Sequence, residues 1–413
     1  MTNENHKLGP LGAEPELSEM ASMFQESLHK FAVDYLRPIG QKLDRMTPEE
    51  VIAPGSPYWE ARSKYLELGI SLDTLGELPL AEQAKMFCIL FEELGWGDSG
   101  LAISFAAGIL PAYLSKMFKN DYLRSLAPDD VLGCWGITEP DHGSDMLDPN
   151  RLMFHSEGSY GRPNCVATIR GDEIILNGQK AAWVSNGSIA KVCILFCAAD
   201  VGQGPSTQHG VCLVLPMHLK GISRGKALNK LGQRALNQGE IFFDNVKLSK
   251  EHILAGPDNY HDAVIAIHSL ANGLMGACFT GVARAAYELA LDYAHERKAG
   301  GVKIIRHQQV AYRLFHMFRK IEAARALTHR VVHYNMTAPT FCLQAAMTSK
   351  VTGTQTAFEV TSDALQMFGG NGLTLEYPME KLLRDARASL IEDGCNEVLA
   401  IKGGYHLIDP DRP

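Results

Sequence analysis

The sequence has no concentration of positive charge. It contains 39 Lys and Arg residues against 47 Asp and Glu residues, giving a formal net charge of -8 at pH 7, and no basic cluster stands out. Binding of nucleic acid or of an anionic membrane surface depends on such a cluster. We therefore expect neither of these as the main partner.

Long apolar runs and paired cysteines are also absent. The N-terminal segment is polar, without the apolar core of a secretory signal, and the longest apolar stretch, Leu101–Leu114, is interrupted by residues such as Pro111. This stretch is shorter than the ~20 residues of a membrane-spanning helix. The nine cysteines are scattered, without a Cys-x-x-Cys pair, which is typical of a reducing compartment. The sequence thus predicts a cytoplasmic protein without a membrane span.

The rest of the composition is that of an ordinary globular protein. Of the 413 residues, 46% are hydrophobic and 21% are charged, values that exclude disordered and fibrous chains. A chain of this length exceeds the size at which one hydrophobic core continues to grow, so we expect two or three domains.

The first part of the chain, residues 1–132, has helical periodicity. Met20, Met23 and Leu28 are spaced as one apolar face of a helix. Residues 80–94 repeat the pattern, and the helix is expected to stop at Gly95-Trp96-Gly97-Asp98. These features predict an N-terminal all-helical domain.

The second part, residues 133–252, has the period of β-strands. Two alternating runs around Gly171-Asp172 predict a hairpin, and polar turns separate further β-rich runs at 192–199, 211–216 and 241–246. The segment 148–163 has no periodicity and is expected to be a surface loop. We expect a small antiparallel β domain here.

The third part, residues 253–413, returns to the helical period. Leu314, Met317 and Ile321 belong to a regular apolar stripe with spacings of three and four residues, which favours mutual packing in a four-helix bundle. The predicted fold class is therefore α+β, with a helical domain, an antiparallel β domain and a C-terminal four-helix bundle.

Two adjacent carboxylates, Glu392 and Asp393, precede Gly394 just before the last apolar helical run. An acid followed by glycine is common in turns, because glycine adopts positive φ and an acidic side chain can bond its own backbone. One interpretation is a plain loop with Asn396 as the N-cap of the last helix. The other is a carboxylate that points into a pocket as a base.

Two stretches of the expected β domain contain residues suited to a polar ring ligand. Thr138, Ser144 and the backbone N–H groups around Gly143 could bond a ring or a phosphate. A strand followed by a Pro-Asp turn explains them equally well without a ligand. Trp183 and Ser185 lie two residues apart on an expected strand and so share a face, where an aromatic ring beside a hydroxyl suits a flavin.

Six motifs occur in one order along the chain: ITEPDHGSD, NGQKAAWVSNG, KLGQRALNQGEIFFDNVKL, ERKAGGVKIIRHQ, QMFGGNG and EYPMEKLLRDAR. Together with FEELGWGD, which begins at Phe91, they resemble the acyl-CoA dehydrogenase family, and the resemblance extends to the C-terminus. It implies the family's helical, β and four-helix-bundle architecture. It also implies an FAD cofactor, an acyl-CoA substrate, an electron-transfer flavoprotein as electron acceptor, and a homo-oligomer, either a tetramer or a dimer.

The resemblance also implies which residues bind the cofactor. In it, Trp183 covers the flavin, Ser185 stands where the family usually has a Thr that bonds flavin N5, and Arg297 belongs to a set that reaches the FAD of a neighbouring subunit. One residue more than in the family pattern separates Lys180 from Trp183, so we expect a bulge in this strand. The implied cofactor-binding residues are Ile137, Thr138, Gly143, Ser144, Trp183, Ser185, Arg297, Gln308, Gln366, Gly370, Asn396 and Glu397.

The resemblance assigns the catalytic base to Asp393. Most members have a Tyr-Glu-Gly-Thr turn after the RDAR motif, and counting from Arg384 places the Glu on Asp393 and the Tyr on Glu392. Other members carry the Glu on the first helix of the bundle, where this chain has Ala271. Asp is one methylene shorter than Glu, and a displacement of about 1 Å can cost about a hundredfold in rate. The implied substrate-binding residues are Ser144, Asn272, Glu392 and Gly394.

Two further expectations concern this turn. Side chains of adjacent residues usually diverge, so only one of Glu392 and Asp393 is expected to face the flavin, and the position of Gly394 favours Asp393. The shorter base, together with Ala271, Asn272 and Gly273, predicts room for an acyl group that is bulky or branched at the α-carbon.

The expected function is FAD-dependent oxidation of an acyl-CoA to the 2,3-enoyl-CoA, by α-proton abstraction and β-hydride transfer to flavin N5. Asp bases also occur in nitroalkane-oxidase-like members, so one alternative is a flavin oxidase or monooxygenase with a non-CoA substrate. Another is a non-catalytic flavin-binding relative, which the acidic charge balance disfavours. His329 and His333 have a metal-ligand spacing, but without a third ligand they are interpreted as a solvated helix face, and no metal is expected.

Overall fold

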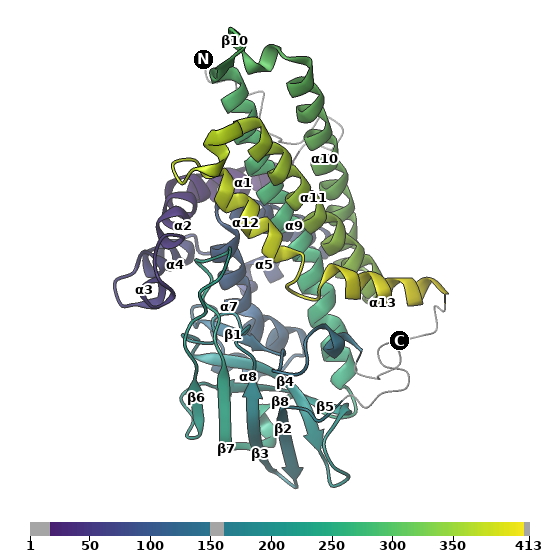
Figure 1. Ribbon diagram of the computed structural model, residues 1–413. Coiled ribbons are helices and arrows are strands. Elements are labelled where there is room, and N and C mark those ends of the chain that lie inside the picture. Colours follow the sequence, from purple (N-terminus) through teal and green to yellow (C-terminus); the bar gives the residue numbers. More distant parts are fainter. Residues whose placement is uncertain (1–16, 149–160, 409–413) are drawn as a thin grey trace.

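The computed structural model describes residues 17–148 and 161–408. The polar N-terminal segment and most of the loop expected at 148–163 lie outside these ranges. The described chain forms a helical part, then a β-sheet, then a second helical part (Figure 1). This order confirms the α+β architecture predicted from periodicity.

Within residues 17–132, the structure has eight α-helices in the N-terminal part. Most of them begin after a Ser, Thr, Asp or Asn whose side chain accepts a hydrogen bond from a backbone N–H of the first turn. They are α1 Glu19–Phe31, α2 Arg37–Leu43, α3 Pro48–Ile52, α4 Pro57–Glu67, α5 Leu72–Gly76, α6 Leu80–Gly97, α7 Ser99–Met117 and α8 Asp121–Leu126.

The apolar stripe predicted for α1 is wrong in its first turn. Met20 and Met23 are 47% and 64% exposed, whereas Leu28 is 1% exposed. The buried face instead consists of Ala21, Leu28 and Phe31, and α1 packs against α6.

Among the described residues, two helices, α7 and α9 (Tyr260–Glu296), are long and apolar enough to cross a membrane by length and composition alone. The helix α7, Ser99–Met117, is longer than the apolar stretch Leu101–Leu114 seen in the sequence. The most apolar windows of α7 and α9 are 61% and 83% buried inside the protein. Packing within the protein thus accounts for their apolar character.

The middle part is an eight-stranded sheet with the order β6-β7-β3-β2-β4-β5-β8, in which β1 pairs with β4. The hairpin predicted around Gly171-Asp172 is confirmed, since Arg170 pairs with Glu173 across it. The strands are β1 Gly133–Gly136, β2 Cys165–Arg170, β3 Glu173–Lys180, β4 Val192–Asp200, β5 Ser206–Pro216, β6 Ile222–Arg224, β7 Ile241–Ser249 and β8 Ile253–Ala255.

The sheet differs from the expected purely antiparallel domain. β4 runs parallel to both β1 and β2, because the chain crosses over between β3 and β4 instead of turning straight back. The sheet also includes β8, so it extends three residues beyond the expected boundary at residue 252. Both faces of β4 are buried, with Cys193 and Leu195 in one core and Ile194 and Phe196 in another, which explains its continuous apolar run.

The C-terminal part consists of three long helices and two short ones. Leu314, Met317 and Ile321 of the predicted stripe are buried. The expected four-helix bundle has a short fourth member, α12, which packs against α9 and α11, and α13 packs on α11. The helices are α9 Tyr260–Glu296, α10 Gln308–Thr337, α11 Leu343–Phe368, α12 Met379–Ser389 and α13 Asn396–Ile408, with a two-stranded turn of β9 Lys298–Ala299 and β10 Val302–Lys303 between α9 and α10.

The two helical parts share one hydrophobic core, since α1, α6 and the long C-terminal helices contribute to the same cluster of buried residues. Glycines allow α6 and α9 to approach backbone to backbone. A Cβ at Gly281 of α9 would lie 2.0 Å from the carbonyl oxygen of Glu92, and a Cβ at Gly95 of α6 would lie 2.0 Å from that of Cys278.

Replacement of Gly281 by alanine is therefore expected to destabilise the protein by at least about 1–3 kcal/mol, because the added methyl must push α6 away from α9. Urea unfolding of the purified variant measures this. Gly404→Ala is the matched control, since a Cβ there meets nothing within 4 Å. If the two variants unfold at the same urea concentration, the close approach of these helices is not required for stability.

Buried ion pairs also fix α6 against α9 and α10. Arg284 of α9 donates to Glu92 at 2.7 Å and to Glu93 at 2.5 Å, and Arg325 of α10 donates to Glu92 at 2.6 Å. Burial raises the pKa of the Glu93 carboxyl, but the charge of Arg284 and the hydrogen bond from His29 outweigh it and lower the pKa to about 2. Both glutamates therefore stay ionised at neutral pH and hold α6 in place.

Candidate functional site

A cavity of about 770 Å³ lies where the three parts of the fold meet. Its walls come from α6, α7 and α9, from loops of the sheet, and from the turn at residues 391–394. Most of the lining is apolar. Cavities of this size with a few polar groups are typical of small-molecule sites. The polar side chains that border it include Thr138, Ser144, Ser185, Lys230, Gln233, Gln238, Glu392 and Asp393.

The turn between α12 and α13 places both of its carboxylates at the cavity. Asp393 has a positive φ of 52°, a left-handed conformation that Asp tolerates better than most residues, and Gly394 follows with φ of 89°. Glu392 and Asp393 both border the cavity. Which of the two side chains faces the flavin stays a prediction in favour of Asp393, since both residues of the turn border the cavity.

Hydrogen bonds from three different elements hold this turn. Asn272 of α9 donates to the Asp393 carbonyl oxygen at 3.3 Å, and Lys350 of α11 donates to the Gly394 carbonyl oxygen at 2.8 Å. The Cys395 N–H donates to the hydroxyl of Ser144 at 3.1 Å. The carboxylate of Asp393 is thus held in place through its main chain.

Burial dominates the electrostatics of the turn. It raises the pKa of the Asp393 carboxyl, and the positive charge of Lys350 offsets only part of that effect. Burial and the negative charge of Asp393 together raise the pKa of Glu392 to about 7. Burial lowers the pKa of the Lys350 ammonium to about 8. Asp393 is therefore a stronger base than an aspartate in water.

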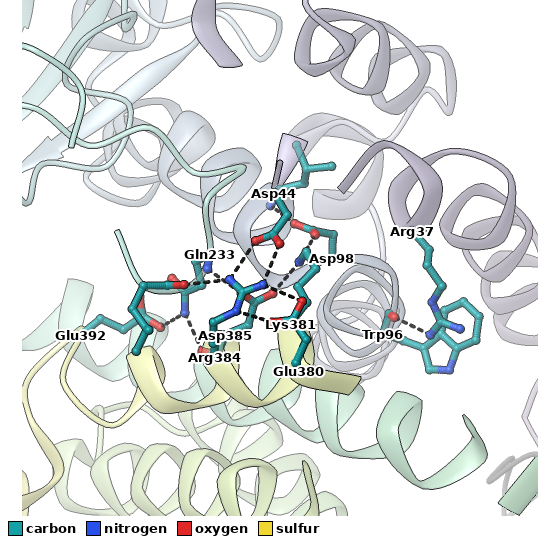
Figure 2. A network of polar contacts seen from close by, with 12 residues as sticks. Arg37, Asp44, Trp96, Asp98, Gln233, Glu380, Lys381, Arg384, Asp385 and Glu392 are labelled. Atoms are coloured by element: carbon teal, nitrogen blue, oxygen red, sulfur yellow. Dashed lines mark hydrogen bonds and ion pairs between the residues drawn. The ribbon is translucent and has the colours of Figure 1, made fainter. Parts of the chain in front are cut away.

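A chain of polar contacts connects Glu392 to all three parts of the fold (Figure 2). The side-chain amide of Gln233 donates to Glu392 at 2.6 Å, and the Gln233 backbone N–H donates to Asp385 at 2.5 Å. Lys381 donates to Asp385 and to Asp98, both at 2.6 Å. The RDAR segment, which contains Asp385, therefore helps to position the wall of the cavity.

Two family models match the regions that build this site. The model described as acyl-CoA dehydrogenase, middle domain, matches residues 134–246, and the model described as acyl-CoA dehydrogenase, C-terminal domain, matches residues 265–404. The chain belongs to the acyl-CoA dehydrogenase family. This confirms the resemblance seen in the motifs and, with it, the expectation of an FAD-dependent oxidoreductase of acyl-CoA metabolism.

Individual proteins similar to this chain agree with the family models. The mitochondrial short-chain specific acyl-CoA dehydrogenase of Rattus norvegicus is 28% identical, covering 95% of this chain and 91% of that protein. The structure of butyryl-CoA dehydrogenase from Megasphaera elsdenii has a TM-score of 0.81 at 24% identity, covering 96% of this chain and 100% of that one. A glutaryl-CoA dehydrogenase from Mycobacterium smegmatis in complex with FADH2 has a TM-score of 0.78 at 21% identity, with 96% of each chain covered. Both structures share the fold.

In this acyl-CoA dehydrogenase family member, the cavity is bordered by the residues that we expect to contact the flavin. The strand expected to carry Trp183 and Ser185 is absent, however. β3 ends at Lys180, and Ser185 forms only a single bridge with Gln238. The extra residue of the motif is accommodated in a turn, because the backbone leaves the sheet after Lys180. Trp183 is 58% exposed, so its ring is available to a flat ligand.

The residues expected to contact the flavin are chemically suited to FAD, the cofactor of the family. Thr138, Ser144 and Ser185 offer hydroxyl groups at the cavity, and Ile137 and Gly143 border it beside them. A Cβ at Gly143 would meet nothing within 4 Å, so the space next to this glycine is open to a ligand. An aromatic side chain, three hydroxyls and an open backbone segment suit a large ring with polar edges.

Four of the implied cofactor-binding residues lie at the far end of the helical bundle and do not border the cavity. Arg297 follows α9 and Gln308 begins α10, while Gln366 lies in the last turn of α11 and Gly370 follows that helix. All four are exposed. The ends of α9 and α11 lie side by side, as Tyr293 stacks on Phe368 with ring centroids 4.1 Å apart. An exposed shared end agrees with contact to a neighbouring subunit's FAD, which stays a prediction.

Three other residues with an implied role, Asn272, Asn396 and Glu397, do not border the cavity. Asn396 is the first residue of α13, where its side chain accepts from Lys350 at 2.8 Å and donates to Thr354 at 3.1 Å. It therefore supports the turn and is not an N-cap. Glu397 is exposed on α13, away from the cavity lining. Asn272 does not border the cavity either, and it acts on Asp393 through the backbone.

Of the small residues on α9 that were expected to leave space for a bulky acyl group, only Ala271 borders the cavity. Ala271 borders the cavity, whereas Gly273 faces Val332, whose Cγ2 would lie 3.2 Å from an added Cβ. The apolar lining instead continues to Tyr65 on α4 and Leu75 on α5. The space therefore extends into the N-terminal helices.

Sequence reasoning missed several residues that build the site. Lys350 is fully buried, Gln233 is 2% exposed, and neither belongs to a recognisable catalytic pattern. Lys230 and Gln238 lie in the KLGQRALNQ segment that supported the resemblance, but their spacing alone gives no sign of a shared wall. Among residues 17–148 and 161–408, no group of three or more His, Cys, Asp or Glu side chains is arranged to hold a metal ion.

Proposed function

We propose that this protein is an FAD-dependent acyl-CoA dehydrogenase, with Asp393 as the base, that oxidises an acyl-CoA thioester to the 2,3-enoyl-CoA. The observation that carries the proposal is the Asp393 carboxylate, which borders a largely apolar cavity on a turn held by three elements and whose pKa burial raises. The family models and the relatives' names support the reaction class.

The residues of the turn divide the chemistry between them. The Asp393 carboxylate takes the α-proton of the thioester. In the described residues the Gly394 N–H donates to no protein acceptor, so it is available to the thioester oxygen, where it would stabilise the negative charge that develops. Thr138, Ser185 and Trp183 would hold and orient the flavin ring. FAD, when bound, supplies the acceptor for the β-hydride.

The partners and location that we propose follow from the family resemblance and the composition. An electron-transfer flavoprotein would accept the electrons, and a homo-oligomer would bring Arg297 and Gln308 of one subunit to the FAD of another. No disulfide joins cysteines in the described residues, which agrees with the cytoplasmic location proposed from the scattered cysteines.

The purified protein is expected to be a yellow oligomer with non-covalently bound FAD, whose absorbance bleaches when an acyl-CoA is added without oxygen. A panel of butyryl-, octanoyl-, palmitoyl- and cyclohexanecarbonyl-CoA also tests the expected preference for a bulky α-carbon, measured as kcat/KM. A higher value for any straight chain contradicts that preference while leaving the reaction itself supported.

The same samples decide between this function and the flavin oxidase alternative. Oxygen consumption with a nitroalkane, combined with no bleaching by any thioester, would show that Asp393 serves a non-CoA substrate. A colourless protein that binds no FAD would contradict both.

A further inference from the structure

One wall of the cavity has a group of polar side chains that proton abstraction at Asp393 does not require. Lys230, Gln233, Gln238 and Glu392 all border the same largely apolar space. Polar groups that are desolvated at such a wall are costly unless a partner satisfies them. The group therefore indicates that a polar part of a ligand lies against it.

The carboxylate of Glu392 is fixed and only partly satisfied. Its Oε1 accepts from the Gln233 amide at 2.6 Å, and Gln233 is itself anchored by Asp385 (Figure 2). In the described residues, Oε2 of Glu392 receives no hydrogen bond. A carboxylate held by such an anchored amide keeps one acceptor oxygen available to the cavity.

The ammonium of Lys230 complements this carboxylate. It donates to the side-chain oxygen of Gln238 at 2.9 Å, which uses one of its three donors. Burial lowers the pKa of Lys230 to about 8, and the nearby charge of Glu392 acts in the opposite direction. The wall thus presents a cationic donor, Lys230, on the same loop segment as Gln233, whose amide holds the anionic acceptor Glu392.

We propose that Lys230 and Glu392 form a polar subsite that selects an acyl thioester with a hydroxyl group close to the reacting carbons. A hydroxyl can donate to the carboxylate and accept from the ammonium at once. An anionic substituent would face Glu392, and a cationic one would face Lys230. An apolar substituent would leave both groups desolvated without a partner. The inference rests on the proposed function, since it takes an acyl thioester as the substrate.

The first test uses the wild-type, FAD-loaded protein without oxygen. The rate of flavin reduction is compared for 4-hydroxybutanoyl-CoA and pentanoyl-CoA, which have the same chain size, and for 4-trimethylammoniobutanoyl-CoA, which adds charge without a donor. We expect at least a tenfold higher kcat/KM for the hydroxylated thioester, the effect of about one hydrogen bond to a charged group. An equal rate with pentanoyl-CoA, or a preference for the ammonium, would overturn the subsite. Reduction by none of the three, nor by the wider panel, would instead count against the proposed function.

The second test locates the preference. Glu392→Met and Lys230→Met are each expected to reduce the hydroxyl-to-methyl ratio of kcat/KM to near one. Glu173→Gln, at an exposed position on β3, removes a carboxylate far from the cavity lining and should keep the wild-type ratio. If both methionine variants keep the preference, another part of the cavity recognises the hydroxyl and the assignment is wrong. The wild-type comparison remains decisive even if a variant does not fold.

Discussion

Asp393→Asn is expected to abolish measurable reduction of the flavin by acyl-CoA while FAD stays bound. Asparagine keeps the size and shape of the side chain and tolerates the left-handed backbone found at this position, where φ is 52°. The turn is held through main-chain atoms of residues 393–395, and these contacts survive the change. The loss therefore measures the base itself, about 10²–10⁴-fold in the rate of reduction. Anaerobic stopped-flow absorbance gives the rate, and the flavin-to-protein ratio gives the occupancy.

Two further variants identify the role of Asp393. Asp393→Glu restores a carboxylate and is expected to recover reduction, since a base is again present at the cavity. Glu392→Gln is expected to keep measurable reduction by unsubstituted acyl-CoA, because its neighbour still removes the proton. If Glu392→Gln loses the reaction and Asp393→Asn retains it, the base is Glu392 and the count from Arg384 is displaced by one residue.

Local patterns in the sequence predicted the order of helical, β and helical parts, because each pattern reflects one element and its buried face. The hairpin at Gly171-Asp172 is an example, since its turn residues and its two flanking strands follow one another directly in the chain. The parallel pairing of β4 with β1 and β2 could not be predicted in this way. It joins strands separated by long connections, and nothing in the strands themselves specifies their direction.

The site shows the same division between local and long-range information. Asp393 was identifiable because its turn has a recognisable composition and lies at a fixed distance from the RDAR segment. Lys350 was not, since it is a single lysine on a helix, and only the fold brings it within 2.8 Å of the Gly394 carbonyl oxygen. Gln233 likewise reaches Glu392 across 159 residues of sequence. Residues that support a site from other elements have no sequence pattern of their own.

Lys381→Met is expected to destabilise the protein by about 3–5 kcal/mol, the cost of removing one partner from a buried ion pair. Lys381 is 6% exposed and donates to Asp98 and Asp385, which are 3% and 1% exposed. Methionine fills a similar volume but leaves two buried carboxylates without a cation. Urea unfolding of the FAD-loaded protein measures the loss. Lys30→Met is the matched control. Lys30 and Asp34 form an i,i+4 ion pair of 2.5 Å, as Lys381 and Asp385 do at 2.6 Å, but the Lys30 pair is exposed and the Lys381 pair is buried. It should change stability little.

The pH dependence of this loss separates electrostatics from packing. Burial already raises the pKa of Asp385, and without Lys381 the like charge of Asp98 would raise it further. The folded variant would then bind a proton that the unfolded chain has released, so its stability must fall as pH rises through the folded-state pKa. The difference between Lys381→Met and wild type is therefore expected to be larger at pH 8 than at pH 5. An equal difference at both pH values would mean that lost packing causes the change, and that the carboxylates of Asp98 and Asp385 do not depend on the lysine charge.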